Sequence, residues 1–172
     1  KKLRDRTLQN ETPLDDGLIP PGYPDGGLGG RDEPEYTNVY WNLAGLRAAI
    51  QGARWLGKTE QAAQWQDEYD EFYAAFRKAA ERDMTVGPNG HRCLPIIMDD
   101  PNPELPQKAQ WAFCHAVYPG QIFPKDAPLV TGNLKMLEAT EQEGMVMSTG
   151  WSTGGIWNYF ASFYGHAWRW TG

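Results

Sequence analysis

Apolar and polar residues follow one another along this chain in blocks that predict five helices and no convincing strand. Residues 36–56 place apolar groups on nearly every side of a 3.6-residue turn, which is typical of a helix surrounded by protein. Residues 59–83 instead carry one aromatic stripe opposite a charged face, as expected of a helix on the outside. The stripe consists of Trp65, Tyr69, Phe72, Phe76 and Ala80.

The same alternation continues to the end of the chain. Residues 107–118 are almost uncharged, and residues 127–143 mix apolar groups with Lys and Glu. Residues 152–170 carry no charge before Arg169. The pattern therefore predicts the order buried, exposed, buried, exposed, buried.

The connections between these helices alternate in length as well. Three long or Gly-rich segments precede the helices expected to be buried: 12–35, 84–106 and 144–151. Because antiparallel neighbours alternate in direction, we expect these three loops to meet on one face, at the N-termini of the buried helices. Long loops held by rigid helices are a common place for function, so this face is the candidate site.

Charge and hydropathy exclude several classes of partner. The net charge is −6, and the longest basic run is the terminal "KKLRDR", which argues against nucleic acid and anionic membranes. No apolar stretch has the length and freedom from polar residues of a membrane span, so we expect no membrane contact. A secretory signal is either absent or already removed. With 172 residues, 41% of them hydrophobic, residues 1–172 are expected to form one domain.

The two cysteines do not indicate a metal site or a disulfide scaffold. Cys93 and Cys114 lack the spacing of paired metal ligands. Two buried free thiols are the simpler interpretation, and a single disulfide is the alternative.

Aromatic residues are unusually frequent, since they make up 13% of the chain and eight of them are Trp. Indole rings stack on the C–H faces of sugars, whose hydroxyls bind carboxylates and amides. Trp151, exposed between glycines in "STGWSTGG", is the preferred sugar platform. Gln110 and Trp111, one turn into their helix, are expected to face the same pocket. These residues suit a carbohydrate ligand, with burial in the core as the alternative for any single Trp.

Four stretches carry a family resemblance: "GLIPPGYPDGG", "EYTNVYWNLAGLRAA", "QWAFCHAVYPGQIF" and "GWSTGGIWNYFASFYGHAW". With the helix order, they resemble the catalytic domain of six-hairpin glycosidases, the (α/α)6-barrel glycoside hydrolases, over nearly the whole chain. The resemblance implies an all-α fold of antiparallel helical hairpins, an α/α toroid. Its parts are a loop over 1–35, hairpins over 36–83 and 107–143, and an inner helix over 152–170.

A full barrel of that family has six inner and six outer helices, so this chain supplies about half of one. The half-ring then either continues in a longer enzyme or is completed by a second copy of the chain in a homo-oligomer. An open half-ring would otherwise leave a large apolar flank, which soluble monomers avoid.

Hydrolysis of a glycosidic bond needs one carboxylic acid and one carboxylate base or nucleophile. Asp25, in "YPDGG", is the expected acid or substrate-binding carboxylate, with an Asp-Gly turn as the alternative. If Pro34 opens the helix, Glu35 lies in its first turn, where the dipole favours a charged base, a hydroxyl ligand or a simple cap. The same helix supplies further substrate-binding candidates, namely Tyr36, Asn38 and Trp41.

No metal site and no cofactor are predicted. Calcium is the alternative, because oxygen ligands are plentiful in the first loop, although their spacing does not match an EF-hand. The candidate ligands would be Asp15, Asp16, Asp25 and Asp32.

Two other function classes stay open. A sugar epimerase or isomerase on the same toroid would use histidine, and His115 and His166 lie within apolar helices, where a hydrogen-bonded core histidine is the structural alternative. A carbohydrate-binding fragment without catalysis is the other.

Overall fold

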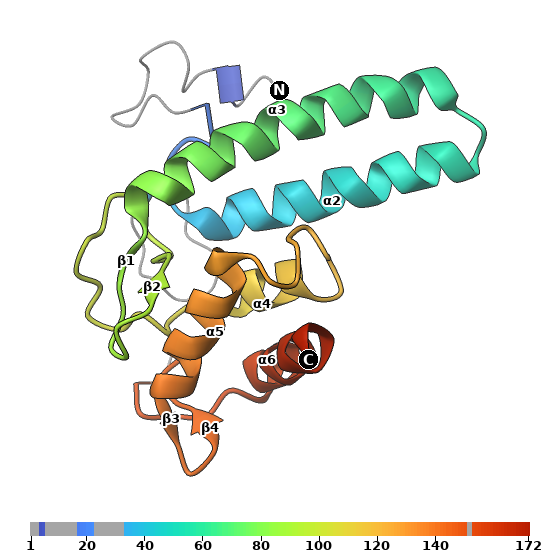
Figure 1. Cartoon of the computed structure of the whole chain (residues 1–172). Coiled ribbons are helices and arrows are strands. Elements are labelled where there is room, and N and C mark those ends of the chain that lie inside the picture. The colour runs from blue at the N-terminus through green and yellow to red at the C-terminus, as the bar shows by residue number, and fades with distance from the viewer. Residues whose placement is uncertain (1–3, 6–16, 23–32, 151–152) are drawn as a thin grey trace.

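The computed structural model describes residues 4–5, 17–22, 33–150 and 153–172, and this part of the chain is mostly helical (Figure 1). Five helices are present in these ranges: α2 (Tyr36–Trp55), α3 (Thr59–Asp83), α4 (Trp111–Val117), α5 (Pro128–Ala139) and α6 (Asn158–Thr171). The predicted all-α class is thus confirmed at the level of helix content. None of the helices in these ranges is long and apolar enough to cross a membrane.

Two small antiparallel sheets interrupt the helices, where the sequence predicted no strand. β1 (Thr85–Val86) pairs with β2 (Arg92–Cys93), and β3 (Glu141–Gln142) pairs with β4 (Met145–Val146). Glu143 and Gly144 join β3 to β4 with φ angles of 53° and 78°, the turn geometry that suits a two-residue hairpin. Strands of two residues are too short to produce a period in the sequence.

Three of the predicted helices are shorter than expected. α5 ends at Ala139 and not at residue 143, because the β3–β4 hairpin follows it directly. α4 begins at Trp111 and not at residue 107, since Ala109 has a φ of 61° and its N–H is bonded to the carbonyl of Thr149. α6 begins at Asn158 and not at residue 152.

The helices pack in a fixed order around one core. α2 and α3 form a long antiparallel hairpin, α4 lies between α2 and α6, and α5 packs on β2 (Figure 1). Aromatic rings from α2, α3 and α4 and the segment after α4 meet edge to face or stacked, with centres 5.7 to 6.1 Å apart. These rings are Tyr40, Phe76, Phe113 and Phe123. Cys93 and Cys114 are buried free thiols, as predicted.

The predicted burial is right for the outer helix α3 and for α4, and wrong for α2 and α6. Phe72 and Phe76 of α3 are buried, whereas its charged face is exposed. α2 and α6 each leave one face in solvent. The exposed residues of α2 include Asn42, Gly45, Ala48 and Ala49, and those of α6 include Tyr159, Ala161 and Gly165.

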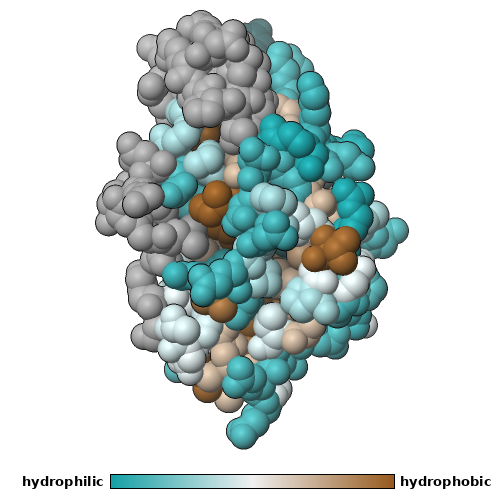
Figure 2. Space-filling view, turned by 90° about the vertical axis from the view of Figure 1, so that its left-hand side faces the viewer, coloured by the Kyte–Doolittle hydropathy of each residue, from teal (hydrophilic) through white to brown (hydrophobic). Residues whose placement is uncertain are grey.

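Described segments of the three long loops lie beside the N-terminal ends of α2 and α4. Tyr36 N–H is bonded to the carbonyl of Ile96, and Met98 N–H to that of Pro34, both at 2.8 Å. On the other side, the Ala109 N–H reaches the Thr149 carbonyl at 3.0 Å. Figure 2 shows the side of the molecule at the left of Figure 1, a mainly hydrophilic face with separate hydrophobic side chains.

Candidate functional site

Rings from α2, α4 and the start of α6 form one continuous series of contacts, which we call the aromatic row. It consists of Trp41, His115, Phe163, Tyr159 and Trp157. Successive ring centres are 4.5, 5.4, 4.8 and 5.1 Å apart. Tyr159 is 49% exposed and the other four are half-buried, so the row can be reached from solvent.

The order of the helices explains the row. α4 lies between α2 and α6, and His115 is the residue of α4 that is not fully buried, so it joins the rings on either side. Tyr159 and Phe163 are four residues apart, which places them on one face of α6. The row is therefore a property of the three-helix packing and not of one sequence motif.

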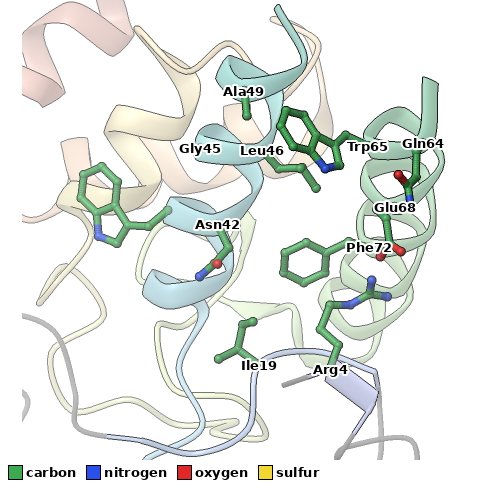
Figure 3. Close-up of a pocket in the computed structure, with 11 residues that line it drawn as sticks. Arg4, Ile19, Asn42, Gly45, Leu46, Ala49, Gln64, Trp65, Glu68 and Phe72 are labelled. Atoms are coloured by element: carbon green, nitrogen blue, oxygen red, sulfur yellow. The ribbon is translucent and has the colours of Figure 1, made fainter. Parts of the chain in front are cut away.

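Two hollows lie on either side of Trp41 and Gly45 in α2. The first, the α2–α3 hollow, has a volume of about 880 Å³ (Figure 3). Trp65 and Phe72 point from α3 toward α2, which presents the small residue Gly45 there. The hollow is lined by Arg4, Ile19, Trp41, Asn42, Gly45, Leu46, Ala49, Gln64, Trp65, Glu68 and Phe72.

The polar groups of the α2–α3 hollow include both signs of charge. The guanidinium of Arg4 lies 4.6 Å from the centre of the Phe72 ring and donates a 2.7 Å hydrogen bond to the Gly17 carbonyl. Glu68 supplies a carboxylate on the same wall, and burial lowers the pKa of Arg4 while the nearby acids oppose that shift. The hollow thus offers two indoles, amides and a balanced pair of charges.

The second hollow, the Arg47 hollow, has a volume of about 540 Å³ and is backed by His115. It is lined by Trp41, Ala44, Gly45, Arg47, Ala48, Gln51, His115, Pro119, Gly120 and Gln121. Arg47 Nη1 donates to the Gly120 carbonyl at 3.2 Å, which holds the guanidinium against the segment after α4. None of the described residues that line this hollow is a carboxylate.

His115 lies at the wall of the Arg47 hollow. Burial between Trp41 and Phe163 lowers the pKa of His115 below its ordinary value of 6.5. Its Nδ1 atom is buried and makes no hydrogen bond with the part of the chain that the structure describes. A neutral ring of this kind can accept a proton or donate a hydrogen bond to a ligand.

The two catalytic candidates of the sequence have different outcomes. Asp25 lies outside the described residues. Glu35 is the residue before α2, with an extended φ of −120°, so Pro34 does not open the helix and Glu35 lies before the first turn. It is 2% exposed, accepts a 2.9 Å hydrogen bond from Asn38 Nδ2, and lines neither hollow.

Three predicted substrate-binding residues lie in the core. Tyr36 is fully buried and its hydroxyl is bonded to Asp83. Gln110 is also fully buried and donates to the carbonyls of Leu94 and Pro106. Trp111 is 2% exposed and packs edge-on against Trp157.

Of the predicted substrate-binding residues that the structure describes, only Trp41 lines the hollows, and it lines both of them. Trp151 and the acids considered for calcium, Asp15, Asp16, Asp25 and Asp32, lie outside the described residues. Within the described ranges no group of His, Cys, Asp and Glu could hold a metal ion. His166 is exposed and packs against Tyr118, away from both hollows.

Sequence reasoning missed the α3 wall and the small residues opposite it. Trp65, Glu68 and Phe72 recur at helical spacing, as do Gly45 and Ala49 of α2. That double spacing was the available signal, because it places each set of residues on one face of its helix, the large side chains of α3 on one and the small residues of α2 on the other. Comparison with protein-family models, curated proteins and solved structures finds no match to this chain.

Proposed function

We propose that this chain is carbohydrate-active, of six-hairpin glycosidase type, and that it binds a sugar chain along the aromatic row. The observation that carries the proposal is the row itself: five rings in contact, open to solvent, running from Trp41 to Trp157. Sugar rings stack on such faces through their C–H groups, and the hollows beside Trp41 supply amides for the hydroxyls.

The half-toroid belongs to the same proposal. Consecutive contacts between α2, α4 and α6, with α3 lying along α2, support an inner row of helices with outer ones beside it. A second copy of the chain would complete the ring as a homo-oligomer. The solution mass measured by light scattering tests this part independently of any ligand.

Hydrolysis by paired carboxylates is the catalytic part of the proposal, with Asp25 as acid and Glu35 as base. The position of Glu35 is the support for this part: the residue lies at the N-terminal end of α2, paired with Ile97 of the second long loop, and its buried carboxylate accepts a hydrogen bond from Asn38. Substitutions Asp25→Asn and Glu35→Gln should each abolish turnover of a glycoside panel while sugar binding persists. Unchanged turnover in either variant would remove that residue from the mechanism.

A sugar epimerase or isomerase is the second candidate, favoured by one observation. His115 presents a neutral ring at the Arg47 hollow, and its buried Nδ1 is without a hydrogen bond to any described residue. His115→Asn should abolish epimerisation measured by NMR if this candidate is right. Hydrolysis by the carboxylates would persist in the same variant.

Sugar binding is tested first, by titrating an oligosaccharide panel while following tryptophan fluorescence and NMR shifts. Trp41→Ala should weaken binding about tenfold or more, the loss expected when a stacked ring is removed. Trp55→Ala is the matched control, because Trp55 is on the same helix, is 87% exposed and lines neither hollow. Equal binding by the two variants would contradict the site.

A further inference from the structure

The Arg47 hollow has a single sign of charge. Arg47 is its one permanently charged lining residue, and none of the described lining residues is a carboxylate, although the whole chain carries a net charge of −6. The neighbouring α2–α3 hollow contains both Arg4 and Glu68. The two sides of Trp41 therefore differ in the charge of ligand that they favour.

From this we infer that the Arg47 hollow binds the carboxylate of an acidic sugar, a uronic acid residue, with Arg47 as the partner of that carboxylate. The inference rests on the proposed sugar-binding function and names the class of sugar.

Arg47 is held in place for such a contact. One nitrogen of its guanidinium donates to the Gly120 carbonyl at 3.2 Å, and the side chain makes no ion pair within the described ranges. A guanidinium has five N–H donors in a planar fork, so its remaining donors match the two oxygens of a carboxylate. A fixed, half-buried cation without a counter-charge favours an anionic ligand.

The rest of the wall suits a sugar ring better than a simple anion. Trp41 and His115 provide adjoining ring faces, with centres 4.5 Å apart, and both line this hollow. Gln51 and Gln121 add amides that can donate to and accept from hydroxyls. A small inorganic anion would use the guanidinium alone and leave these groups to water.

The test compares two ligands that differ in the carboxylate. Binding of glucuronic acid and of glucose, and of the corresponding galactose pair, is measured by NMR titration at low salt. The acid should bind about tenfold to hundredfold more tightly, as expected for a charged hydrogen-bonded pair. Arg47→Gln should remove this preference, so that the acid and the neutral sugar bind this variant with similar affinity.

Arg54→Gln is the matched control. Arg54 lies on the same helix, is exposed, is bonded to Gln66 and lines neither hollow. This variant should keep the preference for the acid. A thermal melt of both variants checks that the fold is intact.

The outcomes distinguish failure of the uronic-acid inference from failure of the sugar-binding proposal. Equal binding of acid and neutral sugar, or a preference that survives Arg47→Gln, overturns the inference and leaves the sugar-binding proposal standing. Acetate or inorganic phosphate that binds as tightly as the uronic acid, and depends on Arg47, overturns the sugar part of the inference. If neither sugar binds, both the inference and the proposed function fail.

Discussion

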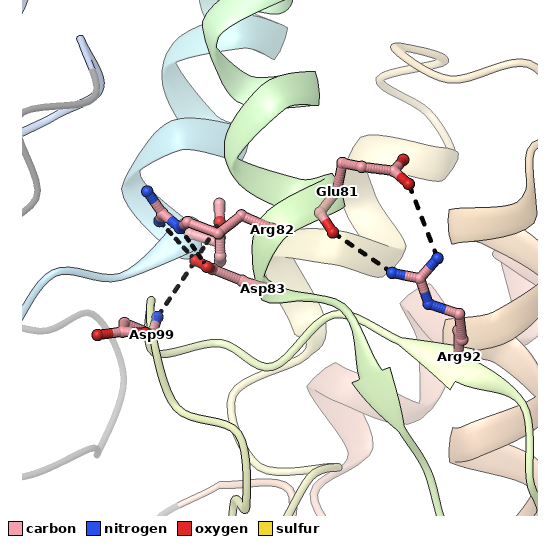
Figure 4. A network of polar contacts seen from close by, with 6 residues as sticks. Glu81, Arg82, Asp83, Arg92 and Asp99 are labelled. Atoms are coloured by element: carbon pink, nitrogen blue, oxygen red, sulfur yellow. Dashed lines mark hydrogen bonds and ion pairs between the residues drawn. The ribbon is translucent and has the colours of Figure 1, made fainter.

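The hydroxyl of Tyr36 donates a 2.7 Å hydrogen bond to Oδ2 of Asp83, joining the first residue of α2 to the last residue of α3. Asp83 also accepts from Arg82 Nη2 at 2.7 Å and from the backbone N–H of Asp99 at 3.2 Å (Figure 4). Its side chain is 1% exposed. The contact closes the open end of the hairpin, next to the loops that meet there.

Asp83 should make the protein sensitive to acid. Burial would raise the pKa of its carboxyl, but the hydrogen bonds from Arg82, Tyr36 and Asp99 outweigh burial and lower that pKa from 3.8. The unfolded chain therefore binds the proton more readily, so the stability that Asp83 contributes is present above about pH 4 and is lost as the pH falls through its lower folded pKa. Urea unfolding at a series of pH values from about 2.5 to 7 measures this slope.

Asp83→Asn should reduce that acid sensitivity and lower the free energy of unfolding at pH 7 by about 1–3 kcal/mol. Asp70→Asn is the control, because Asp70 is exposed on the same helix and bonded to Gln66. An acid limb that is the same in wild type and Asp83→Asn would show that other groups govern it.

Gly132 in α5 should not tolerate a side chain. A Cβ placed there would lie 1.8 Å from the carbonyl oxygen of Arg92 in β2, so the helix and the strand would have to separate. We expect Gly132→Ala to lower the free energy of unfolding by about 3 kcal/mol or more. A thermal or urea melt measures the loss.

Gly165 in α6 is the matched control for this substitution, since a Cβ there meets nothing within 4 Å. Gly165→Ala should stabilise the protein by about 0.5–1 kcal/mol, because alanine loses less backbone entropy in a helix. Similar effects of the two substitutions would mean that α5 does not approach β2 as described.

The side-chain amide of Asn133 pairs with the backbone N–H and C=O of Leu94, as a neighbouring strand would. Its Oδ1 accepts from Leu94 N–H at 2.8 Å, and its Nδ2 donates to the Leu94 carbonyl at 3.2 Å, with all these groups buried. Asn133→Leu preserves the volume and removes the partner of the Leu94 N–H and of Gln110 Oε1, while the Leu94 carbonyl keeps its hydrogen bond from Gln110 Nε2. We expect a loss of about 2–4 kcal/mol. Chemical denaturation measures it, and Asn158→Leu, at an exposed position, should change stability little.

Much of the fold could be predicted because α2 and α3 are long. Each spans many turns, so their periodicity set the limits 36–56 and 59–83, and the observed helices Tyr36–Trp55 and Thr59–Asp83 agree to one residue. The β1–β2 and β3–β4 hairpins have two residues per strand and no period to detect.

Burial and the residues of the site were harder to predict, because both depend on how the helices pack against one another. Gly45 and Ala49 lack polar atoms and therefore looked buried, yet both line an open hollow. Tyr36 and Trp41 have similar side chains one to two turns apart, and only the packing of α3 and α4 decides that Tyr36 points into the core and Trp41 toward the hollows. Composition therefore indicated that many rings are present but not which of them lie at the surface.

A large side chain in place of Gly45 should block ligand access to the hollows. It lines both hollows, and a Cβ at this position meets nothing within 4 Å. Gly45→Leu should therefore fold normally, with a helix slightly favoured by leucine, and should fill the space beside Trp41. We expect sugar binding to be lost in an NMR titration. Gly52→Leu, with an equally open Cβ outside both hollows, should bind like wild type.

His115 should make the free energy of unfolding depend on pH, at higher pH values than those at which Asp83 acts. Burial lowers the pKa of His115 from 6.5, so the unfolded chain binds its proton more readily than the folded one. Its contribution to stability is therefore present above about pH 6.5 and is lost as the pH falls through the lower folded pKa. The wild-type free energy of unfolding should decrease over that range in urea titrations.

The variant His115→Gln should remove this decrease, because the amide does not titrate. His166→Gln should keep it, since His166 is exposed on α6 and outside the aromatic row. An NMR titration of the His115 ring gives the direct measurement. A midpoint at or above 6.5 would contradict the lowered pKa that burial between Trp41 and Phe163 predicts.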